Sequence, residues 1–354
     1  MDKHLVILTL DFKPDTGGVQ EYLFQLAQKW GEQNQVTVVT PVLGELPGKT
    51  HFQRVPLAQS SPLVIWRLLR ELAPTHLLVG HAHPKLLAGA RLWGRYAVLV
   101  HGNDFLAAQG RWHRPFFNDL LKQGQPIVAN SRATAVALQK IINRTATIVY
   151  PGTDPVRFSP AHRTVEGEVP TLLTLARLVP RKGIDTMLQA LPRILQETAV
   201  TYQIGGTGPD RERLEKLARE MGVDHVVQFL GRVPDEVLPQ TFANADLFVM
   251  PNREIQEAGS LEGFGIVFLE ASASGVPVIA GKSGGAVEAI QDGKTGLLVA
   301  PDSIEELSTA VLTLLKDEKK RQRMGQAGRR WVETEMNWDR TAQKFMKLLD
   351  QSHT

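Results

Sequence analysis

The chain has 354 residues, of which 43% are hydrophobic and 22% charged, and it contains no cysteine. The composition is typical of a soluble globular protein, the length favours two domains, and the lack of cysteine excludes disulfides and thiolate metal sites. The net charge is only +3, but residues 1–160 carry 17 Lys and Arg against 10 Asp and Glu. This basic first part suits an anionic substrate or membrane surface, although an unevenly charged solvated surface explains the count equally well.

The N-terminus enters a strand-like run at once and lacks the apolar region and cleavage site of a signal peptide. No apolar run approaches the roughly 18 residues expected of a membrane span. These features, with the absence of cysteine, favour a cytoplasmic protein whose contact with a membrane is at most peripheral.

The first part of the chain alternates strand-like and helical patterns. Apolar residues recur at helical spacing over 18–33, between strand-like runs at 6–12 and 36–42. Further strand-like runs follow, each after a helical segment, at 75–80, 96–102, 126–130 and 146–152. Strands that are apolar on both sides and alternate with helices predict a parallel sheet covered on both faces.

A second series of alternating elements follows the Pro-rich, polar linker 154–170. Its predicted strands are 171–178, 200–206, 226–231, 246–252, 276–281 and 295–300, and residues 304–350 are predicted to be helical throughout. The pattern predicts an α/β fold of two doubly wound, Rossmann-like domains that face each other across a cleft. We assign residues 1–155 to the first domain and 156–335 to the second, followed by a C-terminal helix over 336–354.

Loops at the strand ends of the second domain combine cations, glycines and acids. Arg177 and Lys182 follow one strand, and Gly206 lies in a glycine turn after the next. The long loop after residue 252 contains Glu262 and opens onto a helix containing Glu270, and a second glycine turn at 281–285 is predicted to precede another helix. Together these loops predict a diphosphate pocket with carboxylates for hydroxyl groups, because ligands bind beyond the carboxyl ends of parallel strands. Taken singly, each has an ordinary alternative: solvated cations, plain turns and helix-capping acids.

Candidates in the first domain are fewer. Gly17 and Gly18 form a phosphate-compatible turn without a Walker lysine, and His101 ends a predicted strand. A single histidine at such a position is more often structural than functional. His81 and His83 lack a convincing third ligand, so no metal site is predicted.

These blocks together resemble the family 4 glycosyltransferases of the GT-B fold, along nearly the whole chain. EGFGIVFLEASASGVPVIA (262–280) matches that family's Glu-x7-Glu motif, and RLVPRKG (177–183) resembles its donor-diphosphate Arg and Lys. VYPGTDPVRFSP (149–160) is similar to its interdomain linker, and LDFKPDTGGVQEYLFQLA (10–27) to its first loop and helix. Within the family, phosphatidylinositol mannoside mannosyltransferases and bacterial exopolysaccharide glycosyltransferases look most similar.

The resemblance implies a role for each matching residue. Glu270 would bind the donor ribose and Glu262 would lie beside the transferred sugar, while Arg177 and Lys182 would stabilise the leaving diphosphate. Amides around Phe264, Gly265 and Ile266 would contact sugar hydroxyls or phosphate, the glycine turns at Gly17, Gly18 and Gly206 would approach the donor, and His101 would touch the transferred sugar. The family retains anomeric configuration, and its last helix crosses back to the first domain. No Asp-x-Asp occurs in the chain, which fits a mechanism without metal or cofactor.

The expected activity is therefore transfer of a hexose from a nucleotide-diphosphate sugar to a saccharide or lipid-linked acceptor, in polysaccharide or glycolipid synthesis. Two alternatives are a GT-B-like sugar-nucleotide epimerase and a non-catalytic sugar-nucleotide sensor. The mannosyltransferase likeness favours GDP-mannose, whereas the broader exopolysaccharide group favours a UDP-sugar, to which we give a slight preference.

Three segments of the first domain mix cations with Trp, Leu and Phe: 66–72, 85–96 and 109–124. The mixture suits peripheral contact with an anionic membrane that carries the acceptor, and no nucleic-acid partner is expected. The alternative is that these segments are amphipathic helices whose apolar faces lie in the core.

Overall fold

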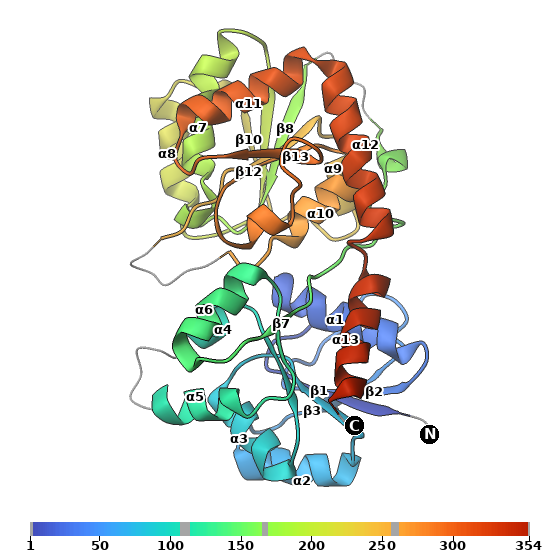
Figure 1. Ribbon diagram of the computed structural model, residues 1–354. Helices are drawn as coiled ribbons and strands as arrows, with labels where there is room; N and C mark the ends of the chain where they lie inside the picture. Colours follow the sequence, from blue (N-terminus) through green and yellow to red (C-terminus); the bar gives the residue numbers. More distant parts are fainter. Residues whose placement is uncertain (1–2, 107–113, 165–168, 256–261, 353–354) are drawn as a thin grey trace. The chain divides into compact units, whose positions relative to one another are not determined.

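The computed structural model describes residues 3–106, 114–164, 169–255 and 262–352. Within them the chain forms two compact units, each built on its own sheet (Figure 1). The first unit comprises residues 3–152, Glu262, Gly263 and 338–352, and the second comprises 153–255 and 264–337. Three peptide bonds therefore connect the two units where both sides are described: 152–153, 263–264 and 337–338.

Seven parallel strands form the sheet of the first unit, in the order β3-β2-β1-β4-β5-β6-β7 among the described residues. They are β1 (His4–Leu8), β2 (Gln35–Thr40), β3 (Gln53–Pro56), β4 (His76–Val79), β5 (Ala97–Val100), β6 (Ile127–Ala129) and β7 (Thr147–Ile148). Both β4 and β5 are buried along their whole length, which confirms the predicted sheet covered on both faces.

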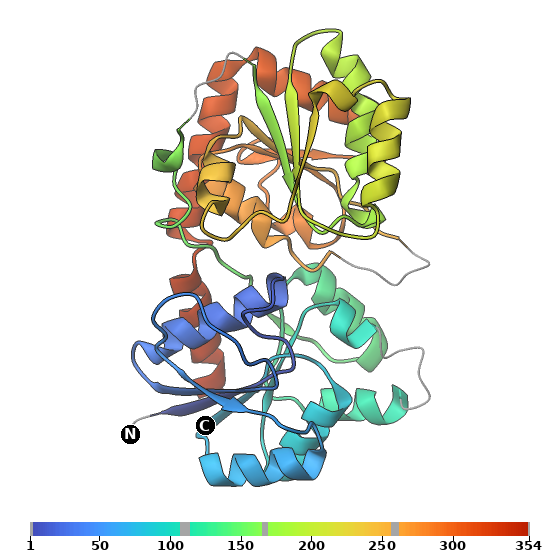
Figure 2. The same cartoon turned by 180° about the vertical axis from the view of Figure 1, so that it is seen from behind.

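The helices of the first unit lie on both faces of this sheet (Figure 2). They are α1 (Gly18–Gly31), α2 (Pro62–Leu72), α3 (Pro84–Trp93), α4 (Asn103–Leu106), α5 (Arg114–Lys122), α6 (Arg132–Ile142) and α13 (Trp338–Gln351). The β1–α1–β2 and β4–α3–β5 crossovers run in opposite directions along the sheet, so right-handed connections place α1 and α3 on opposite faces. Helix α13 packs on α1, whereas α2 and α5 pack on α3.

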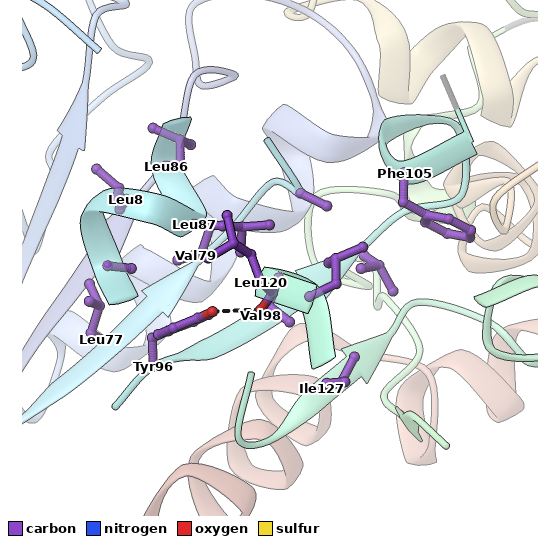
Figure 3. Close-up of a cluster of buried hydrophobic side chains, with 14 of the residues drawn as sticks. Leu8, Leu77, Val79, Leu86, Leu87, Tyr96, Val98, Phe105, Leu120 and Ile127 are labelled. Carbon is purple, nitrogen blue, oxygen red and sulfur yellow. Dashed lines mark hydrogen bonds between the residues drawn. The ribbon is translucent and has the colours of Figure 1, made fainter. Parts of the chain in front are cut away.

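A continuous apolar core fills the space under α2, α3 and α5 (Figure 3). Leu77, Val79 and Val98 contribute from the strands, and Leu86, Leu87 and Leu120 from the helices. Tyr96 is also fully buried, and its hydroxyl donates to the carbonyl oxygen of Leu120 at 2.6 Å. The core thus anchors the strands whose carboxyl ends carry the polar residues described below.

The second unit repeats the plan with six parallel strands, in the order β10-β9-β8-β11-β12-β13. They are β8 (Thr171–Leu175), β9 (Thr201–Gly205), β10 (Val227–Gly231), β11 (Leu247–Met250), β12 (Val278–Gly281) and β13 (Gly296–Val299). The helices are α7 (Ile184–Leu195), α8 (Arg211–Glu220), α9 (Leu238–Ala243), α10 (Ile266–Ala273), α11 (Ile304–Lys316) and α12 (Glu318–Thr334). Helix α7 packs on α8 and α11, and α10 packs on α9 and α12.

Three local predictions are corrected by the structure. The edge strand β3 escaped the sequence pattern because it is only four residues long, contains Gln53 and Arg54, and has no buried position. The glycine turn at 281–285 leads into a short 3-10 helix, Gly284–Glu288, and not into an α-helix. The helix predicted over 304–350 is broken twice: Asp317 leaves helical geometry and caps α12 by accepting from the Lys320 amide at 2.8 Å, and α12 ends before Trp338 starts α13.

Helix α13 is held against α1 by two aromatic side chains. The Trp338 ring packs on the Tyr22 ring with their centroids 5.6 Å apart. The Phe345 ring packs on the Trp30 ring with their centroids 5.5 Å apart. The Trp30 indole also donates to the carbonyl oxygen of Ala342 at 3.1 Å. The C-terminal helix is therefore part of the core of the first unit.

Candidate functional site

Each sheet has one place where the strand order reverses, and ligands of open α/β sheets bind beside the carboxyl ends of the strands there. In the first unit this place lies between β1 and β4, and in the second between β8 and β11. Several residues predicted from the sequence to belong to the site follow the carboxyl ends of strands in these sheets. His101 follows β5, Arg177 follows β8 and Gly206 follows β9. Gly17 and Gly18 lie at the start of α1, just beyond β1, and both are exposed.

The two cations after β8 occupy different environments. Arg177 is exposed, whereas Lys182 is only 7% exposed at the end of the short 3-10 helix Pro180–Lys182. Gly183 follows in the left-handed region with φ 69° and begins α7. A buried ammonium is costly unless its surroundings compensate the charge.

Glycines let the strand-end loops of the second unit pack backbone against backbone. A Cβ on Gly183, Gly206 or Gly281 would lie 1.9 Å from the carbonyl oxygen of Pro251, Ala176 or Asn252, respectively. No side chain fits at that distance. The glycines therefore bring the ends of β8, β9, β11 and β12 together into one polar edge, where backbone groups lie at the surface of the site.

The Glu-x7-Glu segment crosses from one unit to the other. Glu262 is buried and groups with the first unit, whereas Phe264, Gly265 and the helix α10 belong to the second. Gly265, with φ 88°, is the N-cap of α10, and the amides of Gly265 and Ile266 lie at the positive end of that helix. No acid lies in the first turn of α10, and half-buried Glu270 lies one turn further along. Neither acid therefore lies within the first turn of α10.

A second arginine, which the sequence analysis did not single out, ties these loops together. Arg253, just after β11, donates to Asp185 at the start of α7 through two hydrogen bonds, of 3.0 and 2.8 Å. It also donates to Asp302 at 2.6 Å, and Arg213 of α8 donates to Asp185 at 3.1 Å. Burial raises the pKa of Asp185, but the hydrogen bonds and charges of Arg253 and Arg213 outweigh it, so the pKa lies below its ordinary value. The network fixes Arg253, just after β11, against the helix that follows Lys182.

We expect Arg253→Met to destabilise the second unit by about 2 kcal/mol at neutral pH, because Asp185 loses its bidentate partner while half-buried. The depressed pKa of Asp185 stabilises the fold above about pH 4, the value of an unfolded aspartate, and this contribution is lost as the pH falls through the folded pKa. The difference in Tm between variant and wild type should therefore shrink in acid. Lys316→Met, which breaks an exposed 2.9 Å pair with Glu197, is the control and should leave Tm unchanged.

In the first unit, polar side chains connect the ends of three adjacent strands. His101 is buried, and its Nε2 lies 3.0 Å from the carbonyl oxygen of Gly80, just after β4. The Asp104 carboxylate accepts from the His101 amide at 3.0 Å and from the Ala82 amide at 3.1 Å. His81 lies between Gly80 and Ala82 in the sequence, and its Nδ1 is 2.7 Å from a carboxylate oxygen of Asp11, which follows β1.

The pKa values of these groups diverge. The hydrogen bond with His81 lowers the pKa of Asp11 against the opposing effect of burial. Burial alone would lower the pKa of His81, but Asp11 and the charge of Asp104 reverse it, so the His81 pKa lies above its ordinary value. Burial lowers the pKa of His101, which favours a neutral imidazole. Sequence reasoning missed Asp11 and Asp104, although Asp11 lies just beyond the first strand, at the reversal point.

Gly263 packs closely against residues that follow β5 and β6 in the first unit. A Cβ on Gly263 would lie 2.8 Å from the carbonyl oxygen of His101 and 2.9 Å from Nδ2 of Asn130. Asn130 directly follows β6, is 7% exposed, and its Oδ1 has no partner among the described residues. The loop carrying Glu262 therefore lies directly on the residues that follow β5 and β6. Among the described residues, no group of three or more His, Asp or Glu is placed to hold a metal ion.

Comparison with known proteins decides what kind of enzyme carries these sites. Residues 157–331 match the family model described as glycosyl transferases group 1, and residues 16–157 match the model of Glycosyltransferase Family 4. A GDP-mannose-dependent alpha-(1-6)-phosphatidylinositol monomannoside mannosyltransferase of Mycobacterium tuberculosis is 36% identical, over 98% of this chain and 97% of its own. Its counterpart from Mycolicibacterium smegmatis is 32% identical over 98% of both chains. The chain belongs to glycosyltransferase family 4.

The fold agrees with this assignment. Sucrose-phosphate synthase of Thermosynechococcus elongatus superposes with a TM-score of 0.82 at 21% identity, over 99% of this chain and 98% of its own. HepE of Anabaena, solved with UDP and glucose, superposes with a TM-score of 0.78 at 21% identity, over 97% and 99%. This glycosyltransferase therefore has the GT-B fold expected from its sequence. No helix in the described part of the chain is long and apolar enough to span a bilayer.

Proposed function

We propose that this glycosyltransferase transfers mannose from GDP-mannose to a glycolipid acceptor of the phosphatidylinositol mannoside class. The observation that carries the proposal is the 36% identity, over nearly the full length of both chains, to a relative whose name states this donor and acceptor. The solved structures that contain UDP are about 20% identical and support the fold alone. The proposal therefore departs from the slight sequence-based preference for a UDP-sugar.

In this proposal the second unit binds the donor and the first binds the acceptor. Breaking a glycosyl–phosphate bond leaves negative charge on the diphosphate, which fixed cations and amides stabilise. Arg177 and Lys182 supply the cations. The amides of Phe264, Gly265 and Ile266 and the glycine turns at Gly17, Gly18 and Gly206 approach the phosphates and the sugar.

The two acids and His101 complete the proposed site. Glu270 accepts hydrogen bonds from the ribose hydroxyls, while Glu262 and His101 contact the transferred sugar. Attack from the face of the departing phosphate, which takes the acceptor's proton, retains the anomeric configuration.

A panel of nucleotide sugars tests the donor and the reaction class together. We expect GDP-mannose to raise Tm most and to release GDP only slowly without acceptor, but rapidly with vesicles containing phosphatidylinositol mannoside. Conversion of the donor to an isomeric sugar nucleotide would identify an epimerase instead. Binding with neither hydrolysis nor transfer would identify a sensor.

We further propose that catalysis needs no metal ion, because the charges of Arg177 and Lys182 can stabilise a leaving diphosphate and the sequence contains no Asp-x-Asp. The expected result is that excess EDTA leaves the initial transfer rate within about twofold of the untreated enzyme. A loss of activity that Mg²⁺ or Mn²⁺ restores would contradict this part of the mechanism.

The acceptor requires access to a lipid surface, and one face of the first unit is suited to it. The mutually packed helices α2, α3 and α5 expose Leu63, Leu92 and Phe116, each more than half accessible. Exposed Arg67, Arg70 and Arg91 accompany them. The other apolar positions of these helices, such as Ile65, Leu69 and Leu86, lie in the core, as the amphipathic-helix alternative requires. Residues 107–113 of the third predicted segment lie outside the described residues.

We propose that this face contacts anionic membrane through its exposed apolar residues and arginines. Flotation with phosphatidylglycerol vesicles should recover the wild type, and recovery should fall in high salt. Leu92→Asp combined with Phe116→Asp should abolish flotation, while Ile304→Asp, at an exposed apolar position of the second unit, should not. Equal recovery with neutral and anionic vesicles would contradict the electrostatic part of the proposal.

A further inference from the structure

The Asp11–His81 pair lies at the point of the first sheet where a ligand is most expected. Asp11 follows β1 and His81 follows β4, so the pair bridges the two strands between which the strand order reverses. The reaction proposed above assigns no task to either residue.

Hydrogen bonds hold both members of the pair in place. Hydrogen bonds fix the residues on both sides of His81. Nε2 of His101 bonds to the carbonyl oxygen of Gly80, and the Asp104 carboxylate accepts from the Ala82 amide. On the other side, the Thr9 hydroxyl donates to the carbonyl oxygen of Asp11 at 2.9 Å. The Asp11 and His81 side chains are 38% and 19% exposed, so the pair is rigid yet accessible. Such preorganisation is typical of binding groups.

We propose that His81 donates a hydrogen bond from Nε2 to a hydroxyl oxygen of the acceptor, next to the transferred sugar, and that Asp11 positions His81. This inference rests on the proposed function, because it places the acceptor in the first unit beside His101. A carboxylate oxygen of Asp11 lies 2.7 Å from Nδ1 of His81, so Nε2 is the ring nitrogen that remains to donate to a ligand.

The charges around the imidazole select the kind of ligand. Two carboxylates, Asp11 and Asp104, act on His81 and together exceed its single positive charge. Two further histidines act near His81 among the described residues: His83, whose ring centroid is 6.2 Å away, and His101, for which burial favours the neutral form. A phosphate would be repelled by this surplus of negative charge, whereas a neutral polyol or saccharide hydroxyl would not. The pair therefore recognises the sugar or inositol ring of the acceptor and not its phosphate.

The proposal makes acceptor recognition depend on pH. Above the pKa of His81 the neutral ring keeps its hydrogen on Nδ1, toward Asp11, so Nε2 loses its hydrogen and no longer donates. The kcat/KM for the acceptor should therefore fall as the pH rises through the pKa of His81. Asp11→Asn removes the charge that supports the imidazolium and should shift that fall to lower pH.

Steady-state transfer from GDP-mannose to phosphatidylinositol mannoside vesicles tests this role. We expect His81→Asn to lower kcat/KM for the acceptor by about 10- to 100-fold, as for one charge-assisted hydrogen bond, and to remove the alkaline fall. Acceptor-independent hydrolysis of GDP-mannose should change far less. His51→Asn, at an exposed histidine of the same unit, is the control and should leave both rates and the pH profile unaltered. Equal losses of transfer and hydrolysis, or an unchanged pH profile in His81→Asn, would overturn the proposal.

A binding experiment separates this inference from the proposed function. In imidazole ¹H–¹⁵N spectra of the full chain saturated with GDP, methyl α-mannoside and myo-inositol should each be titrated. We expect at least one to shift the His81 signals, and neither to shift those of His51. No shift at His81 with either probe would overturn the inference even if mannosyl transfer is observed. A shift at His81 without transfer from GDP-mannose would support the site and contradict the proposed donor.

Discussion

Lys182→Ala should reduce kcat by about 10²- to 10³-fold, the loss expected when one group that stabilises transition-state charge is removed. Lys182 is buried at the end of the turn after β8, at the reversal point of the second sheet, where a diphosphate would meet a desolvated ammonium. An ammonium removed from water interacts more strongly with developing negative charge than an exposed one does. Single-turnover measurement of mannose transfer under saturating donor isolates this effect from binding.

Two variants control for the buried position of Lys182. Lys216→Ala removes an exposed lysine of α8 and should not alter kcat. Lys182→Met keeps the aliphatic stem, so it should match the alanine variant in rate but the wild type in Tm. If Lys182→Ala remains within a few-fold of the wild-type rate, the ammonium does not stabilise the leaving diphosphate.

Glu270→Ala should lower kcat/KM for the donor by about 10²- to 10³-fold, because two ribose hydroxyls lose a charged hydrogen-bond acceptor. Glu270 lies half-buried within α10, beyond its first turn. Initial rates at low GDP-mannose concentration measure the effect directly. Glu270→Gln, which keeps one carbonyl acceptor, should lose less.

A donor analogue makes this assignment specific to the ribose. The wild type should discriminate strongly against the 2′-deoxy form of GDP-mannose, whereas Glu270→Ala should use both donors equally. The analogue and the substitution then form a double-mutant cycle whose coupling reports the Glu270–hydroxyl contact. Additive losses in the cycle would show that Glu270 does not bind this hydroxyl.

Much of the fold could be predicted because it follows from a strong local signal. Strands such as β5 and β11 are buried along their length, so they read as uninterrupted apolar runs between helical patterns. The edge strand β3 gives no such signal, since one side of an edge strand meets solvent. The break at Asp317 was missed because neither glycine nor proline marks it and helical spacing continues on both sides, whereas a separate last helix was expected from residue 336 and begins at Trp338.

The candidate site could be predicted only in part, for a different reason. Motif residues such as Lys182 and Glu270 stand out in the sequence because their spacing matches a family pattern. Arg253 and Asp185 are 68 positions apart, and Asp11 and His81 are 70 apart; their pairing depends on strand order in the sheet. Sheet order is a property of the whole unit, so no local window of sequence contains it.

The change of unit within the Glu-x7-Glu segment has a consequence for engineering. A chimera that takes its donor specificity from a relative but keeps Glu262 and Gly263 requires four junctions: 152–153, one between residues 255 and 262, 263–264 and 337–338. Glu262 would then stay with the recipient, together with Gly263 and its close fit against His101 and Asn130, while Glu270 would come from the relative. A graft that moves 153–337 as one block would also replace Glu262 and Gly263, so its effect on donor choice could not be separated from altered contacts within the first unit.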